Sequence, residues 1–131
     1  MTPAFRGAAR FGDVERLRAL LDSGSDVDQR DRYHQTALML AAQGGHAEVV
    51  RLLVERGADL DVAAKYSLTA LMLAVIGGHV AVVRLLVAAG ADLTIRGSGA
   101  PGFAGKTALG LALARESPEM VAILRAAGAP E

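Results

Sequence analysis

The segment with the clearest potential for chemistry is Ala100-Pro-Gly-Phe-Ala-Gly-Lys-Thr107, which has the spacing of a phosphate-binding loop with alanine in place of the first glycine. Such a loop cradles phosphates with backbone N–H groups at a helix N-terminus, and a helix is expected to begin at Thr107. However, residues 93–95 are too few for a buried central strand, and no aspartate follows Asp92 to serve as a second metal ligand. A phosphate- or nucleotide-responsive module using this loop is therefore kept as an alternative function.

Histidines and aspartates are the other candidates for chemistry. His46 and His79 stand in the same sequence context, which predicts equivalent places on neighbouring helices about 8–10 Å apart, too far for both to bind one zinc ion. We expect each to cap its helix or hydrogen-bond the loop beside it. Five aspartates recur in successive loops, where short carboxylates can hydrogen-bond nearby backbone and stabilise turns. They are Asp26, Asp28, Asp59, Asp61 and Asp92. No serine, histidine and acid recur together and there is no cysteine, so we predict no catalytic residue, metal ion or cofactor.

A repeat of 33 residues organises the chain. Shifting the sequence by that length places residues 31–62 on residues 64–95 with 20 of 32 positions identical. The matching blocks are Thr36-Ala-Leu-Met-Leu-Ala41, Gly44-Gly-His46 and Gly57-Ala-Asp-Leu60, and each recurs one repeat later. Weaker copies flank this pair on both sides, the downstream copy after additional residues in the loop before Thr107. Such self-similarity predicts a solenoid of stacked units.

Each unit is predicted to be a helix, a turn and a second helix. Thr36, Thr69 and Thr107 are placed as N-caps whose hydroxyls accept hydrogen bonds from the first helical turn. A Gly-Gly-His turn follows, and then a segment with apolar residues at helical spacing that stops at a glycine. Met39 and Met72 are predicted to fill the core with flexible apolar chains. Two short helices cannot bury their apolar face alone, so the units must stack in order to fold.

These blocks resemble the ankyrin repeat family, whose unit carries a Thr-Pro-Leu-His-x-Ala-Ala block, then Gly-His, a paired Leu-Leu and Gly-Ala-Asp. The resemblance covers essentially the whole chain, although alanine and then methionine or glycine stand where the family has proline and histidine, so the family's threonine-to-histidine hydrogen bond is not available. It implies an all-α ankyrin-repeat solenoid. The whole chain would be one domain of four repeats, at about residues 1–30, 31–63, 64–98 and 99–131, with the outer two as degenerate caps.

The resemblance also implies where a partner would bind. In this family the loops between repeats project as hairpin fingers, and together with the first helices they form a concave groove that engages other proteins. Here the implied fingers are residues 30–35 (finger 1), 63–68 (finger 2) and 96–106 (finger 3). The residues predicted to bind a partner are Arg10, Arg32, Tyr33, Gln35, Gln43, Lys65, Tyr66, Leu68, Ile76 and Phe103.

Two tyrosines stand out among these residues. Tyr33 and Tyr66 occupy the same position in successive fingers, and each follows a basic residue, Arg32 or Lys65. Tyrosine and arginine are favoured as binding anchors because they offer contact area and directional groups together. The structural alternative is that each tyrosine packs on its neighbouring finger and stiffens the row. Three apolar residues would add contact area if exposed, namely Leu68, Ile76 and Phe103.

Composition and charge indicate which classes of partner and which locations are not expected. The chain has 14 basic and 14 acidic side chains, a balance that gives no indication of nucleic acid or of a membrane surface as partner. Its apolar runs are far shorter than the ~20 residues of a membrane span, and its first residues lack the apolar run of a secretory signal. We expect a cytoplasmic, protein-binding domain without catalytic activity, monomeric when alone and, from its alanine and arginine content, bacterial. A self-associating structural unit stays as a further alternative.

Overall fold

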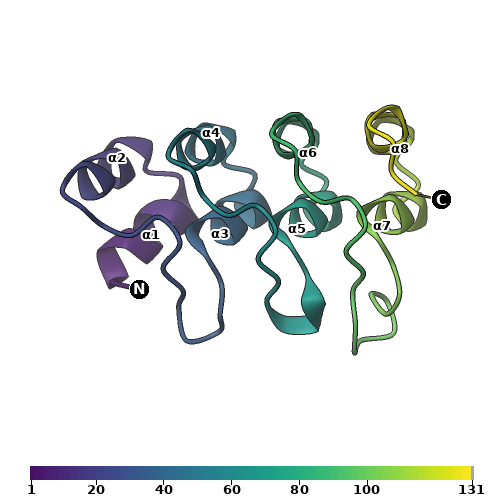
Figure 1. The fold of residues 1–131 in the computed structure, drawn as a ribbon, viewed down its shortest axis with the longest axis horizontal. Coiled ribbons are helices and arrows are strands. Elements are labelled where there is room, and N and C mark those ends of the chain that lie inside the picture. Colours follow the sequence, from purple (N-terminus) through teal and green to yellow (C-terminus); the bar gives the residue numbers. More distant parts are fainter. Residues whose placement is uncertain (131) are drawn as a thin grey trace.

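A computed structural model describes residues 1–130 of the chain. Over this range the regular structure is helical, without a strand. Its helices are α1 (Pro3–Phe11), α2 (Val14–Asp22), α3 (Ala37–Gly44), α4 (Ala47–Glu55), the 3-10 helix η1 (Lys65–Ser67), α5 (Ala70–Gly77), α6 (Val80–Ala88), α7 (Ala108–Ala114) and α8 (Pro118–Ala126). The first helices α1, α3, α5 and α7 form one row and the second helices α2, α4, α6 and α8 form another (Figure 1). The predicted all-α solenoid is confirmed.

A threonine caps the first helix in each of the last three pairs. Thr36 and Thr69 each accept a hydrogen bond at 3.3 Å from the backbone N–H three residues later, and Thr107 does so at 3.2 Å. Each hydroxyl satisfies one of the donors that the start of a helix leaves without a partner. Because all three threonines are buried, the backbone groups could not use water instead. The predicted caps are therefore confirmed.

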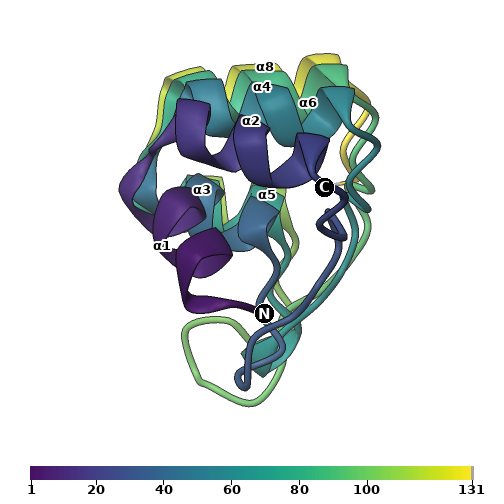
Figure 2. The same ribbon diagram turned by 90° about the vertical axis from the view of Figure 1, so that its left-hand side faces the viewer.

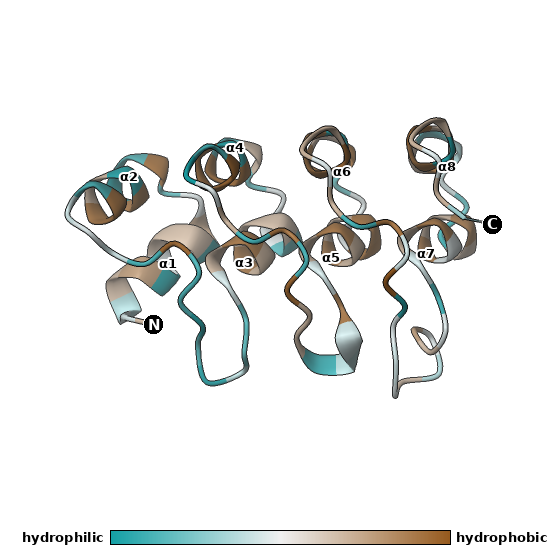
Figure 3. Cartoon of the chain, in the orientation of Figure 1, coloured by the Kyte–Doolittle hydropathy of each residue, from teal (hydrophilic) through white to brown (hydrophobic). Residues whose placement is uncertain are grey.

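The core runs along the whole stack between the two rows of helices, where apolar residues gather (Figure 3). α5 packs against α3, α6 and α7, so it is buried on most of its surface. Alanines such as Ala70 and Ala74 are at most 1% exposed and let neighbouring helices approach closely. Met39 and Met72 are both 1% exposed, which confirms them as packing residues. The helices of residues 1–130 are too short or too polar for a membrane crossing.

Hydrogen bonds link the first helices α1, α3 and α5 each to the helix pair that follows it. The acceptor is the backbone carbonyl at the same repeat position, near the end of the first helix, where carbonyls lack an intrahelical partner. The bonded pairs are His46 Nε2 with Arg10 at 2.8 Å, His79 Nε2 with Gln43 at 2.9 Å, and an Arg115 guanidinium nitrogen with Ile76 at 2.8 Å. Both histidines therefore bond backbone, but neither caps its own helix with its side chain, and the acceptor is the preceding first helix rather than the loop beside each histidine.

The three fingers project from the row of first helices, and finger 3 swings away from the other two (Figure 2). Finger 1 is closed by an isolated antiparallel bridge between Arg30 and Thr36. Finger 2 turns through η1. Finger 3 is tied to finger 2, because the backbone N–H of Ser98 donates to the carbonyl of Tyr66 at 2.8 Å. Fingers 2 and 3 are therefore connected through their backbones.

Candidate functional site

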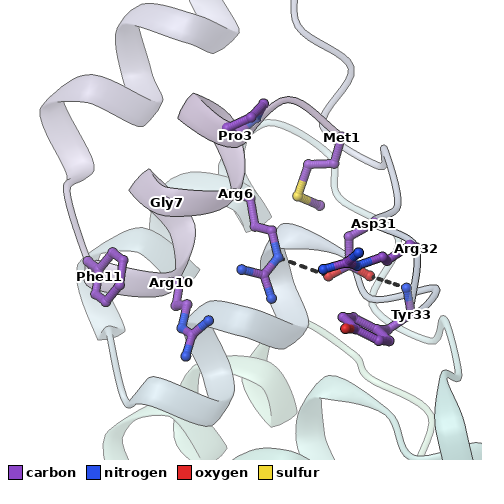
Figure 4. A pocket seen from close by; sticks show the side chains of 9 residues that line it. All are labelled: Met1, Pro3, Arg6, Gly7, Arg10, Phe11, Asp31, Arg32 and Tyr33. Carbon is purple, nitrogen blue, oxygen red and sulfur yellow. Dashed lines mark hydrogen bonds and ion pairs between the residues drawn. The ribbon is translucent and has the colours of Figure 1, made fainter.

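Three adjoining hollows lie where the fingers face the first helices, and we call them together the concave surface. The first lies between α1 and finger 1, and Arg6 and Arg10 point into it beside Tyr33 (Figure 4). The second lies between α1 and α3, next to Gln43. The third, of about 460 Å³, reaches from finger 1 to finger 3 across Ile76 of α5. Arg6 lines all three hollows, so they form a continuous surface.

All ten residues predicted to bind a partner line the concave surface. They come from α1, α3, α5 and all three fingers, which are segments far apart in the sequence. The residues are Arg10, Arg32, Tyr33, Gln35, Gln43, Lys65, Tyr66, Leu68, Ile76 and Phe103. The stacking of equivalent repeat positions is what brings them together. Their role in binding stays a prediction.

Three exposed aromatic rings on this surface each lie beside a cation from the preceding residue. Phe11, Tyr33 and Tyr66 are 75%, 56% and 37% exposed. The distances from cation to ring centroid are 5.6 Å for Arg10 and Phe11, 5.2 Å for Arg32 and Tyr33, and 4.9 Å for Lys65 and Tyr66. Such pairs present apolar area and positive charge together, a combination common at the anchors of protein interfaces.

Arg6 lines the concave surface and is absent from the ten predicted residues, as are Phe11 and Asp31. Arg6 stands at the repeat position of the buried Met39 and Met72, yet its side chain is 31% exposed and its Nε donates to Asp31 Oδ2 at 3.2 Å. Burial raises the pKa of Asp31, but hydrogen bonds from two backbone N–H groups of finger 1 and from Arg6, with the charge of Arg6, outweigh it and hold the pKa below 3.8. Arg6 could have been identified from the sequence, because it places a charge at the repeat position that Met39 and Met72 occupy in the next two repeats.

Tyr33 and Tyr66 have different surroundings despite their equivalent repeat positions. In finger 1 the carboxylate of Asp31 accepts backbone hydrogen bonds and shapes the turn. Finger 2 has Ala64 at that position, and its chain turns through η1 with a φ of 61° at Tyr66. The ring of Tyr66 also lies 5.7 Å from that of Phe103 in finger 3. The structural alternative therefore describes Tyr66, which packs on its neighbouring finger, better than it describes Tyr33.

Leu68 was expected to add apolar contact area if its side chain were exposed, but the structure shows that it is buried. Leu68 is only 7% exposed and belongs to the core cluster. It directly precedes the buried cap Thr69, so the start of α5 carries its side chain inward. Ile76 and Phe103 are partly buried and still line the third hollow. These two residues, not Leu68, supply aliphatic and aromatic area there.

The segment with phosphate-loop spacing is closed by its own hydrogen bonds. The backbone N–H groups of residues 103–106 donate to carbonyls within finger 3 at 2.9–3.0 Å. The hydroxyl of Thr107 is buried and caps α7. A phosphate cradle requires convergent backbone N–H groups that are not already bonded. The geometry therefore does not support the phosphate-responsive alternative.

Aspartate carboxylates accept backbone hydrogen bonds in the loops between repeats and stabilise these loops, as predicted. Asp28 Oδ1 accepts from the backbone N–H of Asp59 at 2.9 Å, and Asp61 Oδ1 accepts from that of Asp92 at 2.8 Å. The Thr94 hydroxyl and then its backbone N–H donate to Asp92 and lower the pKa of that carboxyl. Within residues 1–130, histidine and acidic side chains do not gather in the groups of three that a metal ion would need.

Comparison with known families agrees with this arrangement. The family model for ankyrin repeats, in three copies, matches residues 5–97, a range that contains α2 to α6, nearly all of α1, and fingers 1 and 2. No curated protein matches the chain. The match covers more than half of the 131 residues and coincides with helix pairs that stack in register. The chain therefore belongs to the ankyrin repeat family.

Proposed function

We propose that this chain binds another protein through the concave surface and carries out no catalysis itself. Ankyrin repeats generally act as protein interaction modules. The observation that carries the proposal is the set of three exposed aromatic rings, each beside a cation, on one hollowed surface. In this proposal α7 and α8 form a fourth repeat that caps the stack.

The exposed rings favour binding because covering them removes a large apolar area from water. An aromatic side chain buries about 150–250 Å² when it is fully covered. Tyr33 and Phe11 keep more than half of their surface exposed in the free chain, so a partner can still cover most of each ring. Truncating an anchor of this kind typically costs about 2 kcal/mol or more of binding free energy.

The concave surface is also ordered before a partner arrives. The N-terminal amino group donates to the carbonyl of Arg30 at 3.1 Å, which fixes the base of finger 1. The hydroxyls of Ser67 and Ser98 are hydrogen-bonded at 2.8 Å and join fingers 2 and 3. A surface held in this way loses little conformational entropy on binding, so more of the contact energy appears as affinity.

The proposal is tested by affinity capture from a lysate with the wild type and two matched double variants. One variant carries Tyr33→Ala and Tyr66→Ala on the concave surface. The control carries Arg51→Ala and Arg84→Ala on exposed positions of the second helices α4 and α6. We expect a protein to be retained by the wild type and the control and lost by the tyrosine variant, with binding weakened by about 2 kcal/mol or more.

Circular dichroism of the three proteins decides how a loss is interpreted. Unchanged helicity in the tyrosine variant assigns the loss to the binding surface. Loss of helicity would mean that the tyrosines act structurally, and a protein lost equally from both variants would place binding elsewhere. Either of these last two results would contradict the proposal.

We further propose that the chain acts as a monomer in the cytoplasm. The absence of cysteine is compatible with a reducing compartment. Light scattering over a concentration series checks the oligomeric state. A mass that rises to that of a dimer would favour self-association over binding of a different protein.

A further inference from the structure

The balanced net charge conceals a separation of charge between two parts of the molecule. The first part comprises the fingers, the first helices and the residues that end them, at 1–12, 30–45, 63–78 and 96–116. It holds eight basic residues, Arg6, Arg10, Arg30, Arg32, Lys65, Arg96, Lys106 and Arg115, and two acidic residues, Asp31 and Glu116. The remaining six basic and twelve acidic residues lie on the second helices, on the loops between repeats and at the chain end.

Three cations of the concave surface, Arg10, Arg32 and Lys65, form none of the ion pairs found within residues 1–130. Among the ion pairs of residues 1–130, the one on this surface joins Arg6 to Asp31. Arg10, Arg32 and Lys65 instead lie over aromatic rings and are exposed to solvent. An exposed cation beside a ring keeps its charge available to an incoming carboxylate, and arginine can bind a carboxylate through two parallel hydrogen bonds.

We propose that the concave surface takes an acidic segment of the partner protein, in which glutamate or aspartate alternates with apolar side chains. This inference rests on the proposed function and adds the chemistry of the partner to it. The carboxylates would pair with Arg10, Arg32 and Lys65. The apolar side chains would enter the third hollow, beside Ile76 and Phe103.

The apolar lining of the third hollow is what favours a protein segment over a nucleic acid. Partly buried aliphatic and aromatic groups of Leu73, Ile76 and Phe103 line it together with Tyr66. A phosphate backbone offers no apolar group to fill such a hollow, whereas leucine or phenylalanine of a peptide does.

Three fluorophore-labelled probes test the proposal by anisotropy. The first is a peptide of Glu-Glu-Leu-Phe units, the second has lysine for every glutamate, and the third is a thymidine oligonucleotide of similar length. We expect the glutamate peptide to bind at least about tenfold more tightly than the lysine peptide and the oligonucleotide. Its affinity should fall by about tenfold between about 50 and 500 mM salt, because the paired charges are near the surface.

Two triple variants with the same change of charge locate the binding. Arg10→Gln, Arg32→Gln and Lys65→Gln remove the cations of the concave surface. Arg16→Gln, Arg18→Gln and Arg51→Gln remove three exposed cations of the second helices. We expect the first variant to weaken binding of the glutamate peptide about tenfold and the second to leave it within about twofold, with equal helicity in both.

The outcomes also separate this inference from the proposed function. Equal or tighter binding of the lysine peptide or of the oligonucleotide would overturn the acidic-partner inference, as would equal losses in the two triple variants. If the tyrosine variant still loses its captured protein while the glutamate peptide shows no preference, the binding function stands and only the acidic chemistry fails. If neither the protein nor the peptide depends on this surface, both fall.

Discussion

Replacing Gly45 with alanine tests how successive repeats lock together. Gly45 directly follows α3 as its C-cap and has a φ of 75°, a left-handed conformation that favours glycine. A Cβ at this residue would lie 2.5 Å from Nδ1 and 2.7 Å from Cε1 of His79, whose ring packs against the turn from the following repeat. The ring would have to move, and the bond of its Nε2 to the carbonyl of Gln43 at 2.9 Å would be lost.

Two effects set the expected cost of Gly45→Ala. The left-handed backbone penalises any Cβ by about 1 kcal/mol. Loss of the hydrogen bond from His79 and of its packing adds about 1–2 kcal/mol. We therefore expect the free energy of unfolding to fall by about 2–3 kcal/mol. Gly57→Ala is the matched control, because its φ is 79° but a Cβ there meets nothing within 4 Å, so only the backbone penalty of about 1 kcal/mol applies.

Urea unfolding followed by circular dichroism measures both variants and completes a double-mutant cycle with His79→Ala. In the Gly45→Ala, His79→Ala protein the obstructing ring is absent, so the two costs should overlap and their sum should exceed the measured loss by about 1 kcal/mol or more. Equal losses for Gly45→Ala and Gly57→Ala, or additive losses in the cycle, would refute the idea that the ring of one repeat specifies the glycine of the preceding one.

Three further changes probe separate features. The pKa of Asp31, which burial raises, is held below its usual value in the folded chain mainly by backbone hydrogen bonds, so its contribution to stability is present above the unfolded pKa and is lost as the pH falls through the folded pKa. Asp31→Asn should therefore flatten the decline of the urea midpoint below about pH 4. An unchanged decline would mean that the ionised carboxylate of Asp31 does not stabilise the fold. Thr69→Val leaves a buried N–H at the start of α5 without its acceptor and should lower the free energy of unfolding by about 1–2 kcal/mol. Thermal unfolding measures this loss, and an unchanged Tm would contradict the role of Thr69 as a cap. Glu116→Gly relieves a side chain at a φ of 59° and should raise the free energy of urea unfolding by about 1 kcal/mol, while a decrease would mean that the glutamate side chain itself stabilises the turn.

The fold could be predicted because the signals for it are local and repeated. A threonine hydroxyl caps the N–H groups of its own helical turn whatever lies around it, so Thr36, Thr69 and Thr107 marked the starts of three helices. The exact recurrence of these blocks fixed the register in which units stack. Met39 and Met72 followed from that register, since equivalent positions in internal repeats share the same neighbours.

The candidate site could be predicted only where the repeats are equivalent. Arg6 escaped notice because the first repeat departs from the pattern and places a guanidinium where the internal repeats place buried methionine. Leu68 was predicted to bind a partner because it belongs to a finger, but its burial depends on how the finger joins α5. Finger 3, with its additional residues, has no internal counterpart from which its hydrogen bonds could be inferred.

The sequence by itself determined the helix pairs and the threonine caps of three of them, whereas the side of the stack on which the fingers lie was implied by the family resemblance. The tertiary structure decided which side chains are covered by a neighbouring repeat and which stay exposed. Leu113 shows the reason: Val75, at its repeat position, is 0% exposed because the next repeat covers it, whereas Leu113 in the last helix pair is 47% exposed. Local propensities are encoded residue by residue, but burial, pairing of charges and contact between fingers depend on neighbours that only stacking supplies.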